Sequence, residues 1–260
     1  MLNLARCSFQ ILAHGLTVPA VGIEALKVEA INLKVAQYWS VSVTEETTST
    51  QIDLASNFEA GKVLVAEFQS SGRGRLDRKF EVPPRKGLTF SFTLDSSKYE
   101  HNFGWVPLIS GLAVARAINK HAGKEIVELK WPNDLIIDGK KLAGILSEKN
   151  EKGLIVGIGI NIYQSQDELP IENAISLSMK TKVDRSELLI MILNELGATL
   201  NNIEAEKNNY RKRCLTIGKQ VSAALPTGEI IEDLAIGISN EGALLLNTRE
   251  IRVGDIVHLR

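Results

Sequence analysis

Cysteine is scarce in this chain, which has only Cys7 and Cys214 among its 260 residues. Two cysteines cannot form the disulfide framework on which small secreted domains depend. No Cys-x-x-Cys pair occurs and the four histidines are scattered, so a structural zinc site is not expected. The HExxH motif of zinc peptidases and the GxSxG motif of serine hydrolases are also missing, which leaves those two enzyme classes without their signatures.

An excess of basic residues is missing as well. Lysine and arginine number 30, aspartate and glutamate number 31, and the formal net charge is −1. A non-specific nucleic-acid binder usually carries a basic excess, and attraction to an anionic membrane surface needs a polybasic patch. The charge balance therefore favours neither DNA nor a membrane as a partner.

Long hydrophobic runs are absent too. A membrane-spanning helix needs roughly 18 or more consecutive apolar residues, and no stretch of the sequence reaches that length. The N-terminus has only Arg6 ahead of a moderately apolar segment that His14 interrupts, which does not fit a signal peptide. We therefore expect a cytoplasmic protein.

The length of the chain suits one large domain followed by a small one. Periodicity of apolar residues predicts strands at 62–68, 87–94, 125–130 and 154–162, and helices at 23–37, 106–122 and 184–200. Residues 201–213 are polar and charged, and we expect a helix tail and linker there. From Gln220 onward, short strands alternate with turns at 226–228, 240–242 and 253–255, which indicates a small β-barrel.

The most informative stretch is 129–148, which reads LKWPNDLIIDGKKLAGILSE. Asp138-Gly139 is a strong signal for a two-residue hairpin turn, because a type I′ turn needs positive φ at both central residues. Gly144 in the return strand indicates that a backbone or ligand comes close, since glycine is otherwise rare inside strands. The side chains of Lys130, Asn133, Asp134 and Lys141 surround this hairpin. Taken alone, the stretch also fits an ordinary surface hairpin with solvated lysines.

A second stretch, 67–79, reads EFQSSGRGRLDRK and follows the apolar residues 63–66. Its core, Gly72-Arg73-Gly74-Arg75, alternates flexible backbone with guanidinium groups. Such a loop can fold over an anionic ligand, because arginine binds carboxylate and phosphate groups through paired hydrogen bonds. Alone, this motif also fits a basic surface loop.

Together, the motifs GRGR, KWPNDL, KLAGIL and the glycine-rich strand Gly157-Ile158-Gly159-Ile160-Asn161 resemble the biotin–protein ligase family, from about Thr47 to the C-terminus. The resemblance implies an α+β catalytic domain over residues 1–213, with a mixed β-sheet and helices as in class II synthetases and biotin–lipoate ligases. It implies an SH3-like β-barrel over residues 214–260 that borders the active site. Some members carry an N-terminal winged helix-turn-helix that binds DNA, and this chain resembles the short form without it.

The resemblance also implies an activity, the ATP-dependent attachment of biotin to a lysine of a biotin carboxyl carrier protein of acetyl-CoA carboxylase or a related enzyme. Biotin would react with ATP to give biotinyl-5′-AMP and pyrophosphate, and the carrier lysine would then displace AMP. ATP and Mg²⁺ are the implied cofactors. We expect no DNA or membrane partner, and a monomer or weak homodimer.

The roles of individual residues follow from the same resemblance. Catalytic roles are implied for Lys141, Arg73 and Asp134. The implied biotin-binding residues are Ser49, Thr50, Gln51, Gln69, Arg73, Gly74, Arg75 and Lys141. The implied ATP-binding residues are Arg75, Arg78, Lys130, Asn133, Asp134 and Asn161. Asp134 is also the candidate Mg²⁺ ligand, because that ion prefers oxygen donors. Gln51 departs from the asparagine that the family usually has.

Three residues fit a structural role as well as a functional one. Ser49 fits a plain helix cap or a ligand contact. Trp105 fits core packing better than stacking on an adenine. Asn161 fits the end of a strand or a nucleotide contact.

Rival functions are a lipoate–protein ligase, a non-catalytic biotin-binding or sensing protein, and a DNA-binding repressor. Lipoate–protein ligases share the fold but typically show an Arg-Arg-x-x-Gly-Gly-Gly segment, which this chain lacks. A decayed, non-catalytic site would not keep Lys141, both loop arginines and Asp134 together. The neutral charge balance counts against a repressor.

Overall fold

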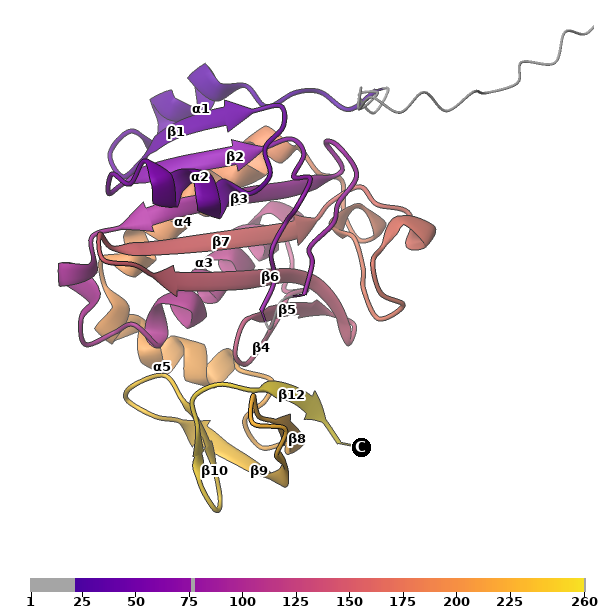
Figure 1. The fold of residues 1–260 in the computed structure, drawn as a ribbon. Coiled ribbons are helices and arrows are strands. Elements are labelled where there is room, and N and C mark those ends of the chain that lie inside the picture. The colour runs from indigo at the N-terminus through magenta and orange to yellow at the C-terminus, as the bar shows by residue number, and fades with distance from the viewer. Residues whose placement is uncertain (1–21, 76–77, 260) are drawn as a thin grey trace, which may run out of the picture.

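A seven-stranded mixed sheet forms the main body of the computed structural model, which describes residues 22–75 and 78–259 (Figure 1). The strands, in spatial order, are β1 (Ser40–Thr44), β2 (Lys62–Ala66), β3 (Gly87–Leu94), β7 (Leu154–Asn161), β6 (Lys140–Lys149), β5 (Asp134–Ile137) and β4 (Glu128–Lys130). Strands β1 and β2 are parallel, and every other neighbouring pair is antiparallel. The expectation of no signal peptide concerns residues 1–21, which lie outside the described residues.

Helices cover the two faces of this sheet unequally. The long helices α3 (Trp105–Ala122) and α4 (Arg185–Leu200) pack together behind it, and α1 (Val28–Val35) contacts β1 and α4 (Figure 1). The short helix α2 (Thr50–Ser56) contacts β2, β3 and β7 from the other side. Single 3₁₀ turns lie at Ser96–Tyr99, Gln166–Glu168 and Leu177–Met179.

The periodicity of apolar residues located most elements correctly. Strand β3 has the predicted bounds, and its Phe90 and Phe92 are fully buried in the core. Helix α4 begins after Asp184, whose carboxylate accepts a hydrogen bond from the Glu187 amide at 2.9 Å. An N-terminal cap of this kind satisfies a backbone donor that the helix leaves free.

Two helix predictions need correction. The predicted helix at 23–37 is formed only at Val28–Val35, because the amide of Leu26 and the carbonyl of Glu24 are bonded to side chains elsewhere in the chain. Residues 201–213 are more than a helix tail, because Ile203–Arg213 form a separate helix, α5. Its buried residues Ile203, Lys207 and Tyr210 follow helical spacing, so the signal was present in the sequence.

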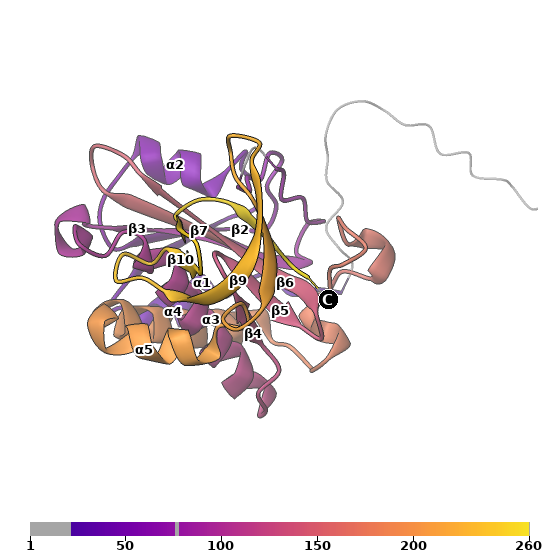
Figure 2. The same ribbon diagram turned by 90° about the horizontal axis from the view of Figure 1, so that it is seen from below.

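The C-terminal strands form a second, fully antiparallel sheet, seen from below in Figure 2. Its strands, in spatial order, are β11 (Glu250–Ile251), β10 (Leu244–Leu246), β9 (Ile230–Ile238), β8 (Gln220–Ala224) and β12 (Asp255–His258). The predicted α+β fold with a small β domain is confirmed. The boundary at residues 213 and 214 stays a prediction.

Two buried tryptophans join the second sheet to the first body. The indole Nε1 of Trp105 donates to the Asn240 carbonyl at 2.7 Å, and that of Trp131 donates to the Gly242 carbonyl at 3.0 Å. Both acceptors lie in the turn between β9 and β10. The two parts of the structure are therefore held together by buried aromatic side chains.

Both edges of the seven-stranded sheet carry polar contacts from other segments. At β1, the Asn32 side-chain amide donates to the Val41 carbonyl and accepts from the Val41 amide, each at 2.8 Å. At β4, the Leu129 carbonyl accepts from the Leu215 amide at 2.8 Å. Helix α1 and the segment that follows α5 thus occupy backbone groups at the two edges.

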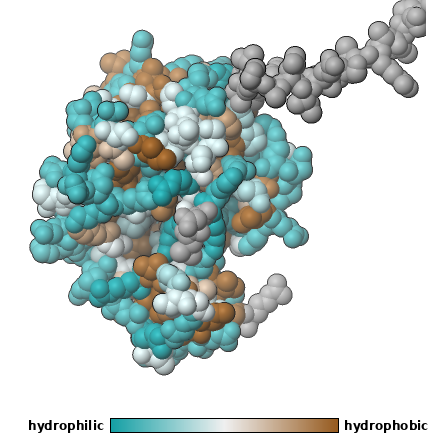
Figure 3. Space-filling view, viewed as in Figure 1, coloured by the Kyte–Doolittle hydropathy of each residue, from teal (hydrophilic) through white to brown (hydrophobic). Residues whose placement is uncertain are grey.

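The surface gives a further view of the described residues. Hydrophobic side chains are scattered among hydrophilic ones on the face drawn in Figure 3. Within 22–75 and 78–259, no helix has both the length and the apolar character that crossing a membrane would require.

Candidate active site

A cavity of about 350 Å³ is lined by residues from α2, from strands β3, β5, β6 and β7, and from the loop that joins β2 to β3. We call this loop the arginine loop; its described residues are Glu67–Arg75 and Arg78–Lys86. Most of the predicted site residues line the cavity, namely Ser49, Thr50, Gln51, Gln69, Arg73, Gly74, Arg75, Arg78, Asn133, Asp134, Lys141 and Asn161. Segments far apart in sequence therefore meet at one concave surface.

Lys141 and Asp134 form an ion pair on the wall of this cavity. The hairpin that carries them has the predicted turn, with φ of 49° at Asp138 and 75° at Gly139. The Lys141 Nζ lies 2.6 Å from Asp134 Oδ1, and both side chains are about a quarter to a third exposed (32% and 22%). A Cβ at Gly144 would lie 3.4 Å from Lys141 Cε, so the close approach predicted at this glycine is made by the lysine side chain itself.

The backbone of Lys141 is held by a separate segment. Its amide donates to the Asn173 carbonyl at 2.9 Å, and its carbonyl accepts from the Ile175 amide at 3.0 Å. Lys141 and Ala174 form an isolated parallel bridge there. Because the lysine is fixed at both backbone groups, only its side chain is left to adapt to a ligand.

Asn133 connects the hairpin to the arginine loop. Its side-chain Nδ2 donates to the Ile145 carbonyl at 2.9 Å, and its Oδ1 accepts from Arg75 Nη1 at 3.2 Å. Burial lowers the pKa of the Arg75 guanidinium, while the nearby Asp134 carboxylate acts in the opposite direction. Arg75 is thus a partly desolvated cation at the cavity wall, where a charge interacts more strongly than in water.

Two other loop arginines bind different parts of the molecule. Arg73 makes a two-point ion pair with Glu148 on β6, with Nη2–Oε1 at 3.0 Å and Nη1–Oε2 at 3.1 Å. Arg78 pairs with Asp255 at the start of β12. The arginine loop therefore contacts the central sheet and the second sheet at once.

Polar side chains at the start of α2 form the other end of the cavity. The amide and hydroxyl of Thr50 both donate to Gln69 Oε1, at 2.8 and 2.9 Å. Ser49 stands at the N-cap position, yet its side chain makes no capping hydrogen bond, which removes the plain-cap interpretation. Gln51 donates to the Leu146 carbonyl at 3.2 Å, and a Cβ at Gly157 would lie 2.9 Å from its Cδ. Gly157 therefore gives room for the longer side chain that replaces asparagine.

Three predicted residues have a more structural environment. Asn161 donates to the Ile175 carbonyl at 3.3 Å and accepts from Gln164 Nε2 at 2.9 Å, so its amide is already bonded although it lines the cavity. Lys130 lies opposite Asp134 in the antiparallel pairing of β4 with β5, but it is not among the residues that line the cavity. Burial lowers its pKa. Trp105 is fully buried against Tyr210, which confirms core packing.

Sequence reasoning missed several cavity residues. The Phe80 ring lies against Gly159, where a Cβ would overlap it, so the glycine was the available signal for this contact. Pro170, Ile171 and Ala174 come from a segment without a distinctive motif, and Asp255 comes from the second sheet.

The cavity offers little for an independent metal site. Within residues 22–75 and 78–259 there is no group of three or more histidine, cysteine, aspartate or glutamate side chains that could hold a metal ion. Asp134 is a carboxylate paired with an ammonium. A single carboxylate of this kind fits Mg²⁺ that is held mainly by substrate phosphates and water. The assignment of Asp134 as a Mg²⁺ ligand stays a prediction.

Comparisons with known proteins identify relatives that cover most of the chain. The model of the biotin/lipoate A/B protein ligase family matches residues 40–164. The biotin–[acetyl-CoA-carboxylase] ligase of Mycobacterium tuberculosis is 32% identical over 237 residues, which cover 85% of this chain and 89% of that protein. The bifunctional ligase/repressor BirA of Bacillus subtilis is 30% identical over 80% of this chain and 68% of its own length.

A solved structure agrees with these sequence matches. The biotin protein ligase of Aquifex aeolicus, in complex with biotin and ATP, matches with a TM-score of 0.75 and 33% identity, over 85% of this chain and 99% of that one. Identity above 30% over most of both proteins, together with the same fold and the motifs gathered at one cavity, settles the family. This chain belongs to the biotin–protein ligases.

Proposed function

We propose that the cavity binds biotin and ATP side by side and joins them as biotinyl-5′-AMP before biotin passes to a carrier lysine. The observation that carries this proposal is that three cationic residues, Lys141, Arg73 and Arg75, line the same cavity as the buried polar residues Ser49, Thr50 and Gln51. Cations suit the reacting anions, and uncharged hydrogen-bonding groups suit the ureido ring of biotin.

The first half-reaction brings two anions together. A carboxylate oxygen of biotin attacks the α-phosphorus of ATP, a new P–O bond forms, and the bond to the β-phosphate oxygen breaks to release pyrophosphate. In this proposal, Lys141 neutralises the carboxylate and the α-phosphate, and Arg75 binds phosphate oxygens. Fixed positive charges at a partly dry site lower the barrier, because they stabilise charge without having to reorient.

Mg²⁺, when bound, would lower the negative charge of the phosphates, with Asp134 as the protein ligand. The remaining work falls to the protein side chains. Arg73 and Arg75 would hold the adenylate, whose mixed anhydride otherwise hydrolyses or acylates stray amines, and keeping water out of the cavity is part of this role.

The second half-reaction needs a neutral amine. A lysine has an ordinary pKa of ~10.4, so its deprotonation at pH 7 costs about 4–5 kcal/mol. The amine of the carrier lysine attacks the acyl carbon, the amide bond forms, and AMP leaves with the electrons of the broken C–O bond. We assign Asp134 to orient the amine and accept its proton, because it is the carboxylate nearest Lys141 on the cavity wall.

The family indicates the class of protein that accepts the biotin. Biotin–protein ligases act on biotin carboxyl carrier domains, and we propose such a domain as the acceptor here. The particular carboxylase, a monomeric or weakly dimeric state, and the absence of DNA binding stay predictions.

A transfer assay tests the proposal. Purified protein is mixed with biotin, MgATP and a biotin carboxyl carrier domain, and mass spectrometry follows the carrier, with lipoate in a parallel reaction. We expect the carrier to gain the mass of one biotinyl group only when ATP is present. Transfer of lipoate alone would favour the lipoate ligase, and tight biotin binding without transfer would favour the non-catalytic binding protein.

A further inference from the structure

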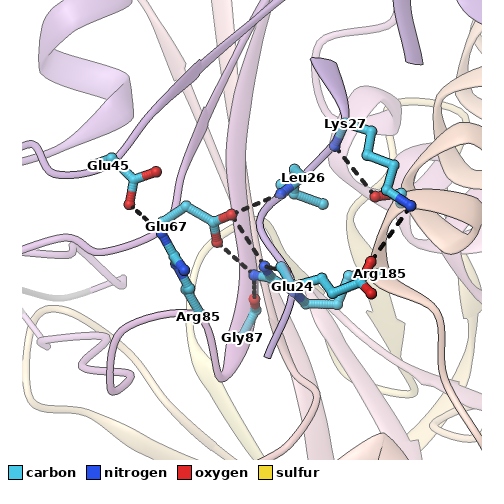
Figure 4. Close-up of polar contacts among 9 residues, drawn as sticks. Glu24, Leu26, Lys27, Glu45, Glu67, Arg85, Gly87 and Arg185 are labelled. Carbon is cyan, nitrogen blue, oxygen red and sulfur yellow. Dashed lines mark hydrogen bonds and ion pairs between the residues drawn. The ribbon is translucent and has the colours of Figure 1, made fainter. Parts of the chain in front are cut away.

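A buried ion pair lies outside the cavity, between Arg185 and Glu67 (Figure 4). Arg185 is the first residue of α4, and Glu67 is the first residue after β2. The Arg185 Nη1 lies 2.6 Å from Glu67 Oε2, and its Nη2 lies 3.0 Å from Oε1. The two side chains are only 3% and 1% exposed.

The stability of α4 does not explain this arginine. A positive charge in the first turn of a helix faces the positive end of the helix dipole, which is unfavourable. Removing both charges from water is costly, and well-packed apolar side chains often replace a buried ion pair without loss of stability. In addition, the Arg185 Nε is buried without a hydrogen-bond partner among the described residues. The pair therefore points to a role other than holding the helix.

Its contacts tie the two ends of the arginine loop together. Arg185 Nη1 also donates to the Gly87 carbonyl at 3.2 Å, at the start of β3. The Glu67 carbonyl accepts from the Arg85 amide at 2.8 Å. Arg85 has a φ of 62°, a left-handed conformation that a non-glycine residue keeps only where its surroundings hold it. Both stems of the loop thus meet at Glu67, whose carboxylate belongs to the ion pair.

A third segment joins the same point. The Leu26 amide donates to Glu67 Oε1 at 3.0 Å, and the Glu24 carbonyl accepts from Arg185 Nη2 at 2.9 Å (Figure 4). The extended residues before α1 are therefore held by the two charged groups that hold the loop stems.

We propose that Glu67 and Arg185 are positioning residues for the arginine loop, and that retention of the adenylate depends on them. Gln69, which is bonded to Thr50 at the cavity, follows Glu67 by two positions, and the loop arginines come next. A displaced stem shifts Gln69 and Arg73 together. This inference rests on the proposed adenylate-forming function.

The test replaces the whole pair, so that no unpaired charge is left buried. Two double variants are made, Glu67→Leu with Arg185→Met, and Glu67→Gln with Arg185→Met; the second keeps an acceptor for the Leu26 amide. Ile192→Val, at a fully buried position of α4, is the control that loses core packing without touching the pair. Each protein is assayed for thermal stability, for the rate of adenylate synthesis in one turnover, and for the release of labelled biotinyl-5′-AMP.

We expect the double variants to make the adenylate but to release it about tenfold faster, equivalent to about 1.4 kcal/mol. We also expect trypsin to cut faster after Arg73 and Arg75 in the double variants than in Ile192→Val, with biotin and ATP bound. Wild-type release and cleavage rates in a folded double variant would overturn the positioning role alone. A wild-type protein that makes no adenylate would overturn the proposed function, and the positioning role with it.

Discussion

At the scale of single residues, Lys141 has the best-defined environment in the cavity. Its backbone is bonded on both sides and its ammonium contacts a carboxylate, so the side chain is aimed before any ligand arrives. Preorganised charge of this kind is the main source of electrostatic catalysis. The ion pair with Asp134 also holds the ammonium group at the cavity wall.

Replacing this lysine should strongly slow the first half-reaction. We expect Lys141→Ala to lower the rate of adenylate formation by about 10²–10³-fold, as is typical when a group that stabilises transition-state charge is removed. Pyrophosphate release in one turnover measures it. Lys140→Ala is the matched control, because Lys140 is the preceding residue of β6 and is not among the cavity-lining residues. A Lys141→Ala protein that forms adenylate at the wild-type rate would show that the central assignment is wrong.

The sequence was most informative about residues within a local motif. Lys141, Asn133 and Asp134 lie around one hairpin, whose turn residues and glycine are readable without tertiary structure. Phe80 and Asp255 were not predicted, because what brings them to the cavity is the path of a loop and the docking of a second sheet. Lys130 was predicted from the resemblance to the family, but the structure does not place it among the residues that line the cavity.

At the scale of elements, Arg73, Arg75 and Arg78 of the arginine loop contact three different parts of the molecule, namely β6, Asn133 and the second sheet. Arg73 is 44% exposed and Glu148 is 38% exposed, so their ion pair contributes little to folding. A weak pair of this kind leaves Arg73 available to a bound anion at small cost. The loop therefore holds Arg73 near its proposed ligand without committing it to a structural role.

Loss of this arginine should weaken retention more than synthesis. We expect Arg73→Gly to make adenylate but to release it, so that lysines of added bystander proteins become biotinylated. Streptavidin blotting of a bystander protein such as serum albumin measures this. Arg249→Gly removes a similarly exposed arginine that pairs with Glu229 away from the cavity, and it should not label the bystander. Equal labelling by both variants would contradict the assignment.

The wall segment after β7 gives a prediction about pH. The Lys86 ammonium and the Ser165 amide hold the pKa of Glu168 at about 2, below its ordinary value of 4.5. The folded chain thus favours the ionised carboxylate more than the unfolded chain does. The resulting stabilisation is fully present above pH 4.5 and is lost as the pH falls through that value towards 2.

Replacing this carboxylate should weaken the dependence of the free energy of unfolding on pH in the acid range. We expect Glu168→Gln to be less stable than the wild type at neutral pH, and the difference to shrink as the pH falls below about 4.5. Urea unfolding at a series of pH values measures it. Glu172→Gln, an exposed position on the same segment, is the control. A constant difference across the acid range would rule out the ionised Glu168 as its cause.

Most elements were predictable from periodicity, and the exceptions have specific causes. Residues 23–27 have helical periodicity, yet their backbone groups bond to Arg185 and Glu67, which the local sequence cannot reveal. Strand order was only partly predictable, because β6 and β7 are joined by a short turn, whereas the pairing of β3 with β7 joins residues that are far apart in the sequence.

At the scale of the whole molecule, the second sheet and the main body share buried contacts. Trp105 and Trp131 donate hydrogen bonds across the junction, and Arg78 pairs with Asp255 from the arginine loop. Separating the two parts would leave the two indole N–H groups, and the two backbone carbonyls that accept from them, without these hydrogen bonds. Unpaired buried polar groups are costly, so the two parts should unfold together.

Thermal unfolding tests this coupling. The chain has three tryptophans. In a Trp39→Phe variant, the two that remain, Trp105 and Trp131, both lie at the junction and report on it. We expect tryptophan fluorescence and far-ultraviolet circular dichroism to give the same midpoint. An earlier fluorescence transition would mean that the second sheet separates before the main body unfolds.

The contacts at the two sheet edges bear on how copies of this chain behave at high concentration. An open edge strand is a template onto which another chain can add, and growth of this kind leads to aggregation. Asn32 holds both backbone groups of Val41 on one edge, and the Leu215 amide holds the Leu129 carbonyl on the other. Edge-to-edge pairing between the seven-stranded sheets of two copies is therefore blocked at both of these positions. On the β4 edge, the protecting contact comes from the segment that leads into the second sheet. The C-terminal part of the chain therefore also protects the main body from aggregation.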